Sequence, residues 1–244
     1  MTILALDTSG TTASAALVNE YITLAESSVT LADLRGAGRK THSETLMPMV
    51  DGLFKITAMT LENVDYIACT CGPGSFTGLR IGAATAKGLA FAAGKPLIAV
   101  PTLDAMAYAV EGLLMPDTWV VPMIDARRQQ AYSAFYHQNE RMTDYMAQPV
   151  ETLYEMIKER APEGSNIIFP VGFMPPAQAK SGCGSTAKSP EKGCSFFFRP
   201  MPLRASCVGA KALTMLNKAA SEREFALLYI RKPQAERERE ARSK

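Results

Sequence analysis

The sequence predicts an α/β fold of two half-chains, each with the element order βββαβα. One observation is an apolar run that ends in an acid and leads into a polar turn, which occurs at residues 3–7 and again at 119–125. The other is an Asn-Glu pair, typical of a tight turn, that follows each run at Asn19 and at Asn139. These features indicate an internal duplication. The alternative is that two unrelated hairpins share the pattern.

Composition places the chain among ordinary globular proteins. It has 244 residues, 47% of them hydrophobic and 20% charged, with a net charge of +2. This balance supports a buried core, and so small a net charge does not by itself indicate a nucleic-acid surface. No apolar run approaches the roughly 18 residues of a membrane span, and the first residues lack the basic stretch of a signal peptide. The five cysteines then indicate reduced thiols, so we expect a cytoplasmic protein with no membrane partner.

The first half is expected to begin with three strands and to continue with alternating helices and strands. The patterns predict strands at 2–7, 13–18, 21–29, 64–71 and 96–100, helices at 41–57, 76–93 and 103–114, and a loop at 31–40. Thr41 can cap the first helix, and Glu44 completes a capping box. We place the boundary between the halves near residue 115, which gives domains of 1–115 and 116–244.

The second half repeats this order less regularly. The patterns predict strands at 119–125, 131–136 and 167–171 and helices at 152–160 and 206–219. The late helix would complete the second copy. Residues 170–195 are rich in Gly, Pro, Ser and Lys, which predicts an irregular loop, and the charged tail 235–244 is typical of a solvated end.

The polar turn after the first strand is a candidate phosphate site. Asp7 ends the strand, and Ser9 follows within the run Asp-Thr-Ser-Gly-Thr-Thr. Backbone N–H groups and hydroxyls of such a turn can surround a phosphate, while the carboxylate orients a hydrated magnesium ion. Asp125 would be the corresponding acid of the second half. The alternative is a plain hairpin turn capped by its own side chains.

A glycine-rich turn lies between the strand at 64–71 and the helix at 76–93. Helix N-termini in this position receive anions, and the candidate phosphate contacts are Gly72, Gly74, Ser75 and Arg80. The run lacks the Gly-Lys-Ser/Thr ending of a P-loop, and its third glycine falls one place too late for a dinucleotide-binding fingerprint. The alternative is a tight connection whose glycines let two backbone segments approach.

Two predicted helices are candidates for a partner interface. Small and apolar residues recur on them at three- and four-residue spacings, which lets another helix come close. The candidate residues are His42, Leu46, Met49, Val50 and Leu53 on the first helix and Gly78, Gly82, Thr85, Ala86 and Leu89 on the second. The alternative is that these helices pack within the same chain.

Metal and nucleophile chemistry find little support in the sequence. His42 is one of only two histidines, and the position one turn later is Leu46 rather than a second histidine. Cys69 and Cys71 share a strand face, but zinc needs two further ligands nearby. We therefore expect no metal, no tightly bound cofactor and no catalytic residues.

Three motifs together resemble a known family. They are the runs Leu4 to Ser9, His42 to Leu46 and Gly72 to Gly82. Their order and spacing are similar to those of the bacterial TsaB family, also called YeaZ. The resemblance covers residues 1–135 well, returns near 228–236 and is weak over 160–205. It implies an actin-like, Hsp70-like ATPase fold of two ribonuclease-H-like halves.

The resemblance also implies a role in forming N6-threonylcarbamoyladenosine at position 37 of tRNAs that read codons starting with A. The TsaB-type subunit would be non-catalytic, pairing with the transferase TsaD and acting with the ATPase TsaE. It would meet tRNA only through the complex, and without TsaD it would form a homodimer through the same helices. The resemblance leaves open whether ADP or ATP binds at the contact with TsaD.

The resemblance bears on metal binding as well. TsaD-type relatives hold a metal with two histidines one turn apart, and Leu46 stands in the second place here. A leucine cannot replace an imidazole ligand, so the metal centre should be absent.

Two other functions are weighed against this one. The first is an ATP-dependent phosphotransferase of the same fold class, with Asp7 and Asp125 around magnesium. The second is a glycoprotease, which we rank last because the sequence offers neither a histidine pair nor a nucleophile set.

Overall fold

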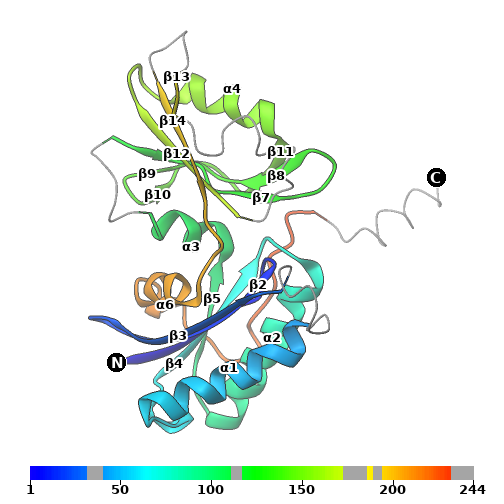
Figure 1. Ribbon diagram of the computed structural model, residues 1–244, viewed down its shortest axis with the longest axis vertical. Helices are drawn as coiled ribbons and strands as arrows, with labels where there is room; N and C mark the ends of the chain where they lie inside the picture. The colour runs from blue at the N-terminus through cyan, green and yellow to red at the C-terminus, as the bar shows by residue number, and fades with distance from the viewer. Residues whose placement is uncertain (32–40, 111–116, 173–185, 189–193, 232–244) are drawn as a thin grey trace, which may run out of the picture.

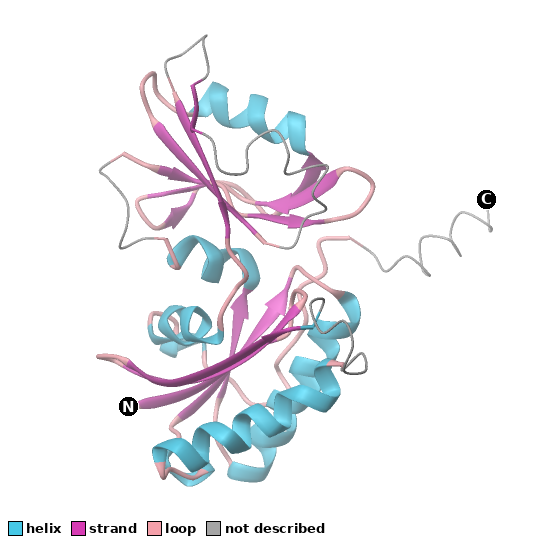
Figure 2. Cartoon of the chain, viewed as in Figure 1, coloured by secondary structure: helices cyan, strands magenta, loops and turns pink. Residues whose placement is uncertain are grey.

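A computed structural model describes residues 1–31, 41–110, 117–172, 186–188 and 194–231 of the chain. These residues form two lobes, each built on a β-sheet, with two helices between them (Figure 1). Further helices cover the outer faces of the sheets, so helix and sheet alternate from one end of the molecule to the other (Figure 2). No helix within these ranges is long and apolar enough to cross a membrane.

The first lobe contains a five-stranded sheet in the order β3-β2-β1-β4-β5. Its strands are β1 (Thr2–Asp7), β2 (Thr12–Asn19), β3 (Thr23–Thr30), β4 (Tyr66–Gly72) and β5 (Leu97–Pro101). The first three form an antiparallel meander, and β4 and β5 run parallel to β1. Nearly every residue of β1, β2 and β4 is buried, as in a sheet covered on both faces. The predicted strands of this half are confirmed.

Two long helices cover the outer face of the first sheet. They are α1 (His42–Thr57), which a short helix η2 (Leu61–Asn63) follows, and α2 (Phe76–Ala93). The predicted capping box is present, and the Thr41 backbone N–H donates to Glu44 Oε2 at 2.7 Å. Ser75 caps α2 by accepting from the Gly78 N–H, and Gly94 ends the helix in a left-handed conformation. Both helices and the sheet enclose an apolar core.

The second lobe contains a nine-stranded sheet. Its strands are β6 (Trp119–Val120), β7 (Met123–Asp125), β8 (Gln130–Ser133), β9 (Tyr136–His137), β10 (Glu140–Arg141), β11 (Met146–Pro149), β12 (Asn166–Val171), β13 (Thr186–Lys188) and β14 (Ser195–Pro200). β8 pairs antiparallel with both β7 and β11, whereas β12 runs parallel to β6, β7 and β14.

The second sheet repeats the topology of the first. The pairing order β11-β8-β7-β12-β14 corresponds to β3-β2-β1-β4-β5, with the same pattern of parallel and antiparallel neighbours. The helix α4 (Val150–Arg160) lies between β11 and β12 as α1 lies between β3 and β4. The predicted internal duplication is therefore confirmed.

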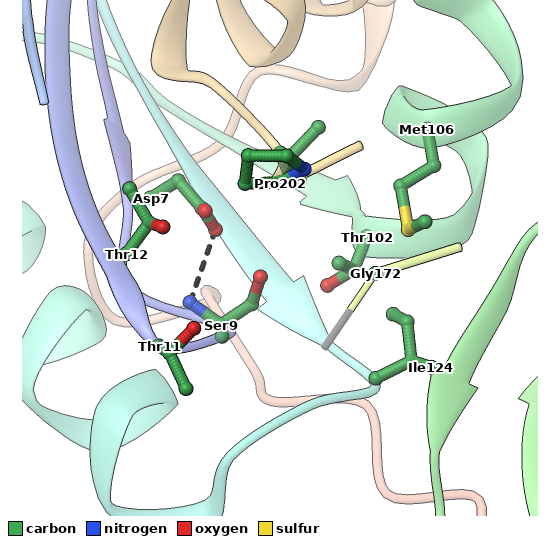
Figure 3. A pocket seen from close by; sticks show the side chains of 11 residues that line it. Asp7, Ser9, Thr11, Thr12, Thr102, Met106, Ile124, Gly172 and Pro202 are labelled. Carbon is green, nitrogen blue, oxygen red and sulfur yellow. Dashed lines mark hydrogen bonds between the residues drawn. The ribbon is translucent and has the colours of Figure 1, made fainter. Parts of the chain in front are cut away.

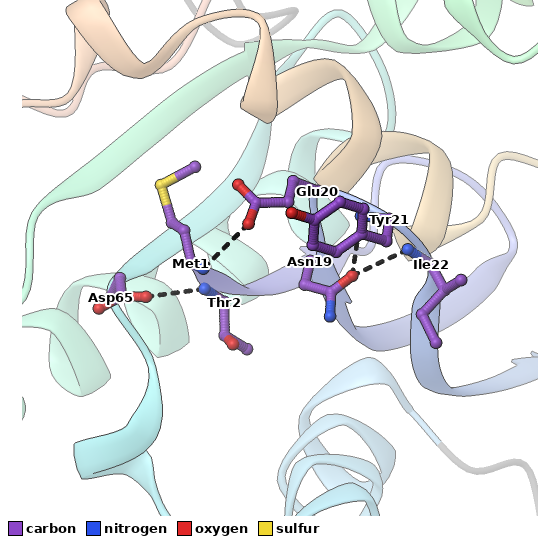
Figure 4. A network of polar contacts seen from close by, with 7 residues as sticks. All are labelled: Met1, Thr2, Asn19, Glu20, Tyr21, Ile22 and Asp65. Carbon is purple, nitrogen blue, oxygen red and sulfur yellow. Dashed lines mark hydrogen bonds and ion pairs between the residues drawn. The ribbon is translucent and has the colours of Figure 1, made fainter.

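Both predicted Asn-Glu turns form. At the first, which joins β2 and β3, Asn19 Oδ1 accepts from the backbone N–H groups of Tyr21 and Ile22 at 2.9 and 2.8 Å (Figure 4). At the second, which joins β9 and β10, Gln138 and Asn139 both have positive φ. A two-residue hairpin requires this left-handed backbone, and asparagine tolerates it.

The second lobe departs from the predicted elements in two ways. The expected strand 119–125 is broken into β6 and β7, because Pro122 has no N–H to donate to the sheet. The expected strand 131–136 is likewise divided, between β8 and β9. The strands β10, β11, β13 and β14 lie where none was predicted, β13 within the expected loop 170–195. Most of the expected loop 170–195 lies outside the described residues, as do the expected loop 31–40 beyond its first residue and the charged tail.

Two helices form a layer between the sheets: α3 (Thr102–Tyr108), which is shorter than the predicted 103–114, and α6 (Ala205–Leu213). Although α6 follows β14 in sequence, it packs on β1 and β2, and the Ala205 N–H donates to Ser14 Oγ at 2.9 Å. Gly209 makes this contact close, since a Cβ there would lie 2.7 Å from Val18. The late helix therefore completes the second copy in element order, since α6 follows β14 as α3 follows β5, but it packs on the first lobe. The helix also ends earlier than predicted, and a short helix η4 (Leu216–Lys218) follows it.

Candidate partner face and interlobe turn

Asp7 ends β1 inside a buried turn. Its carboxylate is 1% exposed, and Oδ1 accepts from the Ser9 N–H at 3.1 Å and from the Thr70 hydroxyl at 2.8 Å. Burial raises the pKa of the Asp7 carboxyl above its ordinary value, and the hydrogen bonds from Ser9 and Thr70 and the nearby His42 oppose that rise. The predicted turn therefore forms, with its acid held by donors of the same chain.

A small pocket lies beside this turn, between the lobes (Figure 3). Its polar wall comes from the first lobe and α3, and comprises Asp7, Ser9, Thr11, Thr12 and Thr102. Its apolar side is formed by Met106, Ile124, Pro202 and Leu203. The volume is about 30 Å³, enough for roughly one or two water molecules with the lobes in this arrangement.

Asp125, the corresponding acid of the second lobe, does not line this pocket, although its neighbour Ile124 does. Asp125 Oδ1 accepts from the Arg127 N–H at 2.7 Å, and Oδ2 lies 3.4 Å from the Arg127 guanidinium. The phosphotransferase hypothesis requires Asp7 and Asp125 to line one pocket. The structure does not bring them together in this way.

The glycine-rich turn packs directly on the Asp7 turn. A Cβ on Gly74 would overlap the Ser9 carbonyl oxygen, and a Cβ on Gly78 would overlap that of Thr8. The Ser75 N–H donates to the Ser9 carbonyl at 2.7 Å, and the Thr8 hydroxyl donates to the Gly78 carbonyl at 2.8 Å. These contacts favour the interpretation of the turn as a tight connection, because only glycine allows two backbones to come so close.

The other two candidate phosphate residues have different surroundings. Gly72 has a φ of 116°, and a Cβ there would lie 2.6 Å from the Leu228 carbonyl oxygen. The Arg80 guanidinium lies 3.7 Å from the centre of the Phe76 ring, and its Nε donates to the Tyr229 hydroxyl at 3.4 Å. Arg80 is therefore bound to an aromatic pair, whereas Ser9, Gly74 and Ser75 contact one another.

The residues at the start of α1 do not fit a metal. Burial lowers the pKa of the His42 imidazole, and the charge of Asp7 and the backbone of Gly10 and Thr12 oppose this lowering. The Nε2 atom of His42 is buried without a hydrogen-bond partner. Leu46, one turn later, is buried in the core and supplies no ligand. Within the described ranges, no three His, Cys, Asp or Glu side chains gather as a metal site. The donor set differs from the pair of imidazoles that the resemblance implies for TsaD-type relatives.

The structure corrects the predicted partner interface, because most of its residues face the core of this chain. Those buried are Leu46, Met49, Val50, Leu53, Gly78, Gly82 and Ala86, while His42, Thr85 and Leu89 are half-buried. A Cβ on Gly82 would overlap the Thr8 hydroxyl and lie 3.3 Å from Cys69 Sγ. The small-residue stripe thus lets α2 pack closely on β1 and β4, which is the intramolecular alternative that the sequence left open.

The outward face of α2 consists mostly of small and apolar residues. Thr77, Ala84 and Gly88 are exposed along it, with Phe76 and Phe91 at 41% and 72% exposure. Arg80 is the exposed charged residue of this face, and its guanidinium lies against the Phe76 ring. An exposed apolar patch marks an interaction site. Thr77, Ala84 and Gly88 were not among the predicted interface residues, although their spacings of seven and four residues are a helical signal displaced from the predicted stripe.

The outward face of α1 is more polar than that of α2. It presents the ion pair between Lys55 and Asp51, whose atoms lie 2.6 Å apart, beside the exposed side chain of Met47. We define the candidate partner face as five of the exposed residues of α2, namely Phe76, Thr77, Ala84, Gly88 and Phe91; Arg80 and Ala92 are exposed beside them.

Comparison with known proteins identifies the family and the fold of the chain. A family model described as TsaD, tRNA N6-adenosine threonylcarbamoyltransferase, matches residues 37–220. The tRNA threonylcarbamoyladenosine biosynthesis protein TsaB of Haemophilus influenzae is 38% identical over 132 residues, which are 54% of this chain and 52% of that protein. TsaB of Bacillus subtilis is 34% identical over 164 residues, 66% of this chain and 67% of that protein. The match thus spans about half to two thirds of these relatives.

Solved structures match the fold over a greater length. YeaZ from Pseudomonas aeruginosa superposes with a TM-score of 0.70 at 24% identity, covering 93% of this chain and 99% of that one. The ethanolamine utilization protein EutJ from Carboxydothermus hydrogenoformans gives a TM-score of 0.50 at 13% identity, covering 86% and 89%.

The duplicated lobes and the acid-led turn between them define a protein of the actin-like ATPase fold. Within that class, the family match and the TsaB relatives are specific. The chain belongs to the TsaB/YeaZ family, and it carries the region recognised by the TsaD family model.

Proposed function

We propose that this protein is a non-catalytic subunit of the complex that forms N6-threonylcarbamoyladenosine at position 37 of tRNAs that read codons starting with A. It pairs with a TsaD-type transferase and acts with a TsaE-type ATPase, and it meets tRNA only through the complex. The names of the Haemophilus and Bacillus relatives supply the pathway. The observation that carries the pairing is the apolar outward face of α2.

The candidate partner face has the properties that helix packing requires. Ala84 and Gly88 present almost no side chain, and a Cβ on Gly88 would meet nothing within 4 Å, so a partner helix can come close. Phe76 lies at the start of α2 and Phe91 near its end, and both can bury their rings in a partner. A second copy of this chain offers the same face, so a homodimer would compete with the TsaD-type partner.

The non-catalytic role rests on what surrounds Asp7 and His42. Leu46 takes the place of a second imidazole, and it is packed in the core rather than near a cavity. The pocket beside Asp7 has an apolar side and a volume of about 30 Å³. These features support a subunit that holds neither a catalytic metal nor a tightly bound nucleotide.

The pairing is tested by mixing the purified protein with its cognate TsaD-type protein at micromolar concentration and measuring the mass by light scattering. We expect a heterodimer for the wild type and none for Gly88→Arg, whose long side chain blocks a close helix contact. The substitution should leave the fold intact, because arginine is a better helix former than glycine and the site is open.

Two further samples make this experiment decisive. Met142→Arg places the same side chain at an exposed position of the second lobe and should pair normally. A Gly88→Arg protein that unfolds at the wild-type temperature but still pairs would contradict the proposed face. A wild-type protein that never associates with TsaD would contradict the proposed function itself.

The phosphotransferase alternative is separated by calorimetric titration with ATP and magnesium. It has some support because the predicted turn around Asp7 does form. We expect no binding by the isolated chain, since Asp125 does not line the pocket and its carboxylate is paired with Arg127. A dissociation constant below roughly 10 μM, lost in Asp7→Asn, would favour the enzyme.

A further inference from the structure

The last described segment of the chain runs along the first lobe and ends at the second (Figure 1). Ala220 exchanges two backbone hydrogen bonds with Leu97 of β5, at 2.9 and 3.0 Å. Phe225 is buried in the core between α2 and the sheet, and the Leu228 N–H donates to the Cys71 carbonyl at 2.7 Å. These contacts fix residues 220–228 on the first lobe, and we call residues 220–231 the C-terminal strap.

The end of the strap reaches across to the second lobe. Tyr229 lies against Phe76, with ring centres 5.9 Å apart, and accepts from Arg80 of α2. Two residues later, the Arg231 guanidinium donates to the Ala126 carbonyl at 3.3 Å and to the Gln130 side-chain oxygen. Ala126 lies in the turn between β7 and β8, and Gln130 is the first residue of β8. Arg231 thus joins the strap, which is fixed on the first lobe, to the β7–β8 hairpin of the second lobe. This hairpin includes Ile124, which lines the pocket.

The turn that Arg231 binds has an unusual backbone. Arg127, Arg128 and Gln129 have φ values of 65°, 55° and 60°, so three consecutive residues other than glycine are left-handed. Such a run is disfavoured and persists only where its surroundings hold it. Two backbone hydrogen bonds close it, from the Ala126 N–H to the Gln130 carbonyl at 2.9 Å and from the Gln130 N–H to the Arg127 carbonyl at 3.2 Å. The Asp125 carboxylate, which accepts from the Arg127 N–H, and the two hydrogen bonds from Arg231 restrain it further.

The two lobes are joined on the other side of the pocket by a different kind of contact. There α3 and α6 share one apolar core with residues of both sheets, and Asp104 ties α3 to the second lobe by hydrogen bonds from Tyr136 and Tyr145. Between α3 and α6 themselves, apolar packing allows small sliding and bending, whereas the hydrogen bonds of a guanidinium fork have defined directions. The lobes are therefore joined by packed helices in the middle layer and by the Arg231 hydrogen bonds at the end of the strap.

We propose that Arg231 is a clasp that keeps the two lobes closed over the pocket beside Asp7, and that its release lets the lobes open about the α3 and α6 layer. In the closed arrangement, Ile124 of the second lobe lines the pocket across from the Asp7 turn (Figure 3). Opening exposes both acid-led turns to solvent and leaves the left-handed turn at 127–129 without its hydrogen bonds from Arg231.

Hydrogen exchange measured by mass spectrometry on the full chain tests the clasp. In Arg231→Ala, we expect exchange about tenfold faster in peptides covering residues 8–12 and 122–130, because two hydrogen bonds from a charged donor are lost. Peptides from α1 and α4 should exchange as in the wild type. Gln130→Ala, which removes one acceptor from the clasp, should give a smaller change in the same peptides.

A matched control lies on the strap itself. Arg223 is highly exposed and forms an ion pair with its neighbour Glu222, so Arg223→Ala removes the same side chain without touching the second lobe. The proposal fails if Arg231→Ala exchanges like the wild type or if Arg223→Ala opens the same peptides. It also fails if exchange rises equally throughout both lobes, since Arg231 would then serve only global stability.

Discussion

Thr8 and Gly78 hold the loop after β1 against the first turn of α2. The Thr8 hydroxyl donates to the Gly78 carbonyl oxygen at 2.8 Å, and the Thr8 carbonyl oxygen occupies the space of the Cβ that Gly78 lacks. The contact fixes the position of α2 over the sheet. It therefore also sets the direction in which the candidate partner face points.

Gly78→Ala should lower the free energy of unfolding by about 2–3 kcal/mol, because the added methyl group overlaps backbone that cannot move freely. Gly88→Ala, on the exposed side of the same helix, should raise it by about 0.5–1 kcal/mol, since alanine is the better helix former. Urea unfolding of both variants checks the pair. Changes of the same sign would mean that the close contact is not present in solution.

Thr102→Val should raise the free energy of unfolding by up to about 1 kcal/mol. The Thr102 hydroxyl is buried beside the pocket without a hydrogen-bond partner, so an isosteric methyl group removes an unsatisfied group. Thr70→Val is the matched contrast, because the Thr70 hydroxyl donates to Asp7, and we expect it to lower stability by about 1–3 kcal/mol. Equal losses in thermal unfolding would show that Thr102 has a partner, such as an ordered water.

The stability of the protein should depend on His42 in mildly acidic solution. Burial holds the folded pKa of His42 below 6.5, so the folded state binds a proton less readily than the unfolded state. The free energy of unfolding should therefore fall as the pH drops below 6.5 toward the folded pKa. His42→Gln should lose this component of the decline between about pH 8 and about pH 5.

The second histidine provides the control for this measurement. His137→Gln should keep the decline, and a curve for His42→Gln that matches the wild type would contradict the argument. Asp7 acts in the opposite sense, because burial raises its pKa and stability falls as the pH rises above 3.8. A variant series at a single pH would not separate the two groups.

Tyr136→Phe should lower the free energy of unfolding by about 1.5–3 kcal/mol. Asp104 of α3 accepts from the hydroxyls of Tyr136 and Tyr145 at 2.6 and 2.7 Å, which joins the middle layer to the second lobe. Burial raises the pKa of both phenols, so they remain donors at neutral pH. A double-mutant cycle with Tyr145→Phe should show coupling between the two, and strictly additive losses would argue against a shared acceptor.

Much of the fold follows from the sequence because its elements have strong local signals. The capping box at Thr41 and Glu44 and the Asn-Glu turns mark where elements begin and reverse, and all three form as predicted. The break at Pro122 could also have been anticipated, since proline has no N–H. What the local pattern does not contain is the packing of α6 on the opposite lobe, which depends on contacts between residues nearly 200 positions apart.

The site was harder to predict than the fold. The stripe containing Gly78 and Gly82 has the spacing of a helix face that packs closely. It does pack closely, but against β1 and β4 of the same chain. Periodicity identifies a face that packs closely without identifying what it packs against. Deciding between the two apolar sides of α2 required knowing on which side the sheet lies.

The exchange of α6 between lobes has a consequence for how the protein is made. As the ribosome extends the chain, the first five strands emerge early, but the helix that shields one side of them is encoded after the whole second sheet. Phe225, which completes the core on the other side, emerges later still. The first lobe therefore stays unfinished until the chain has been made through residue 225, and it cannot complete its folding before the second lobe has been synthesised.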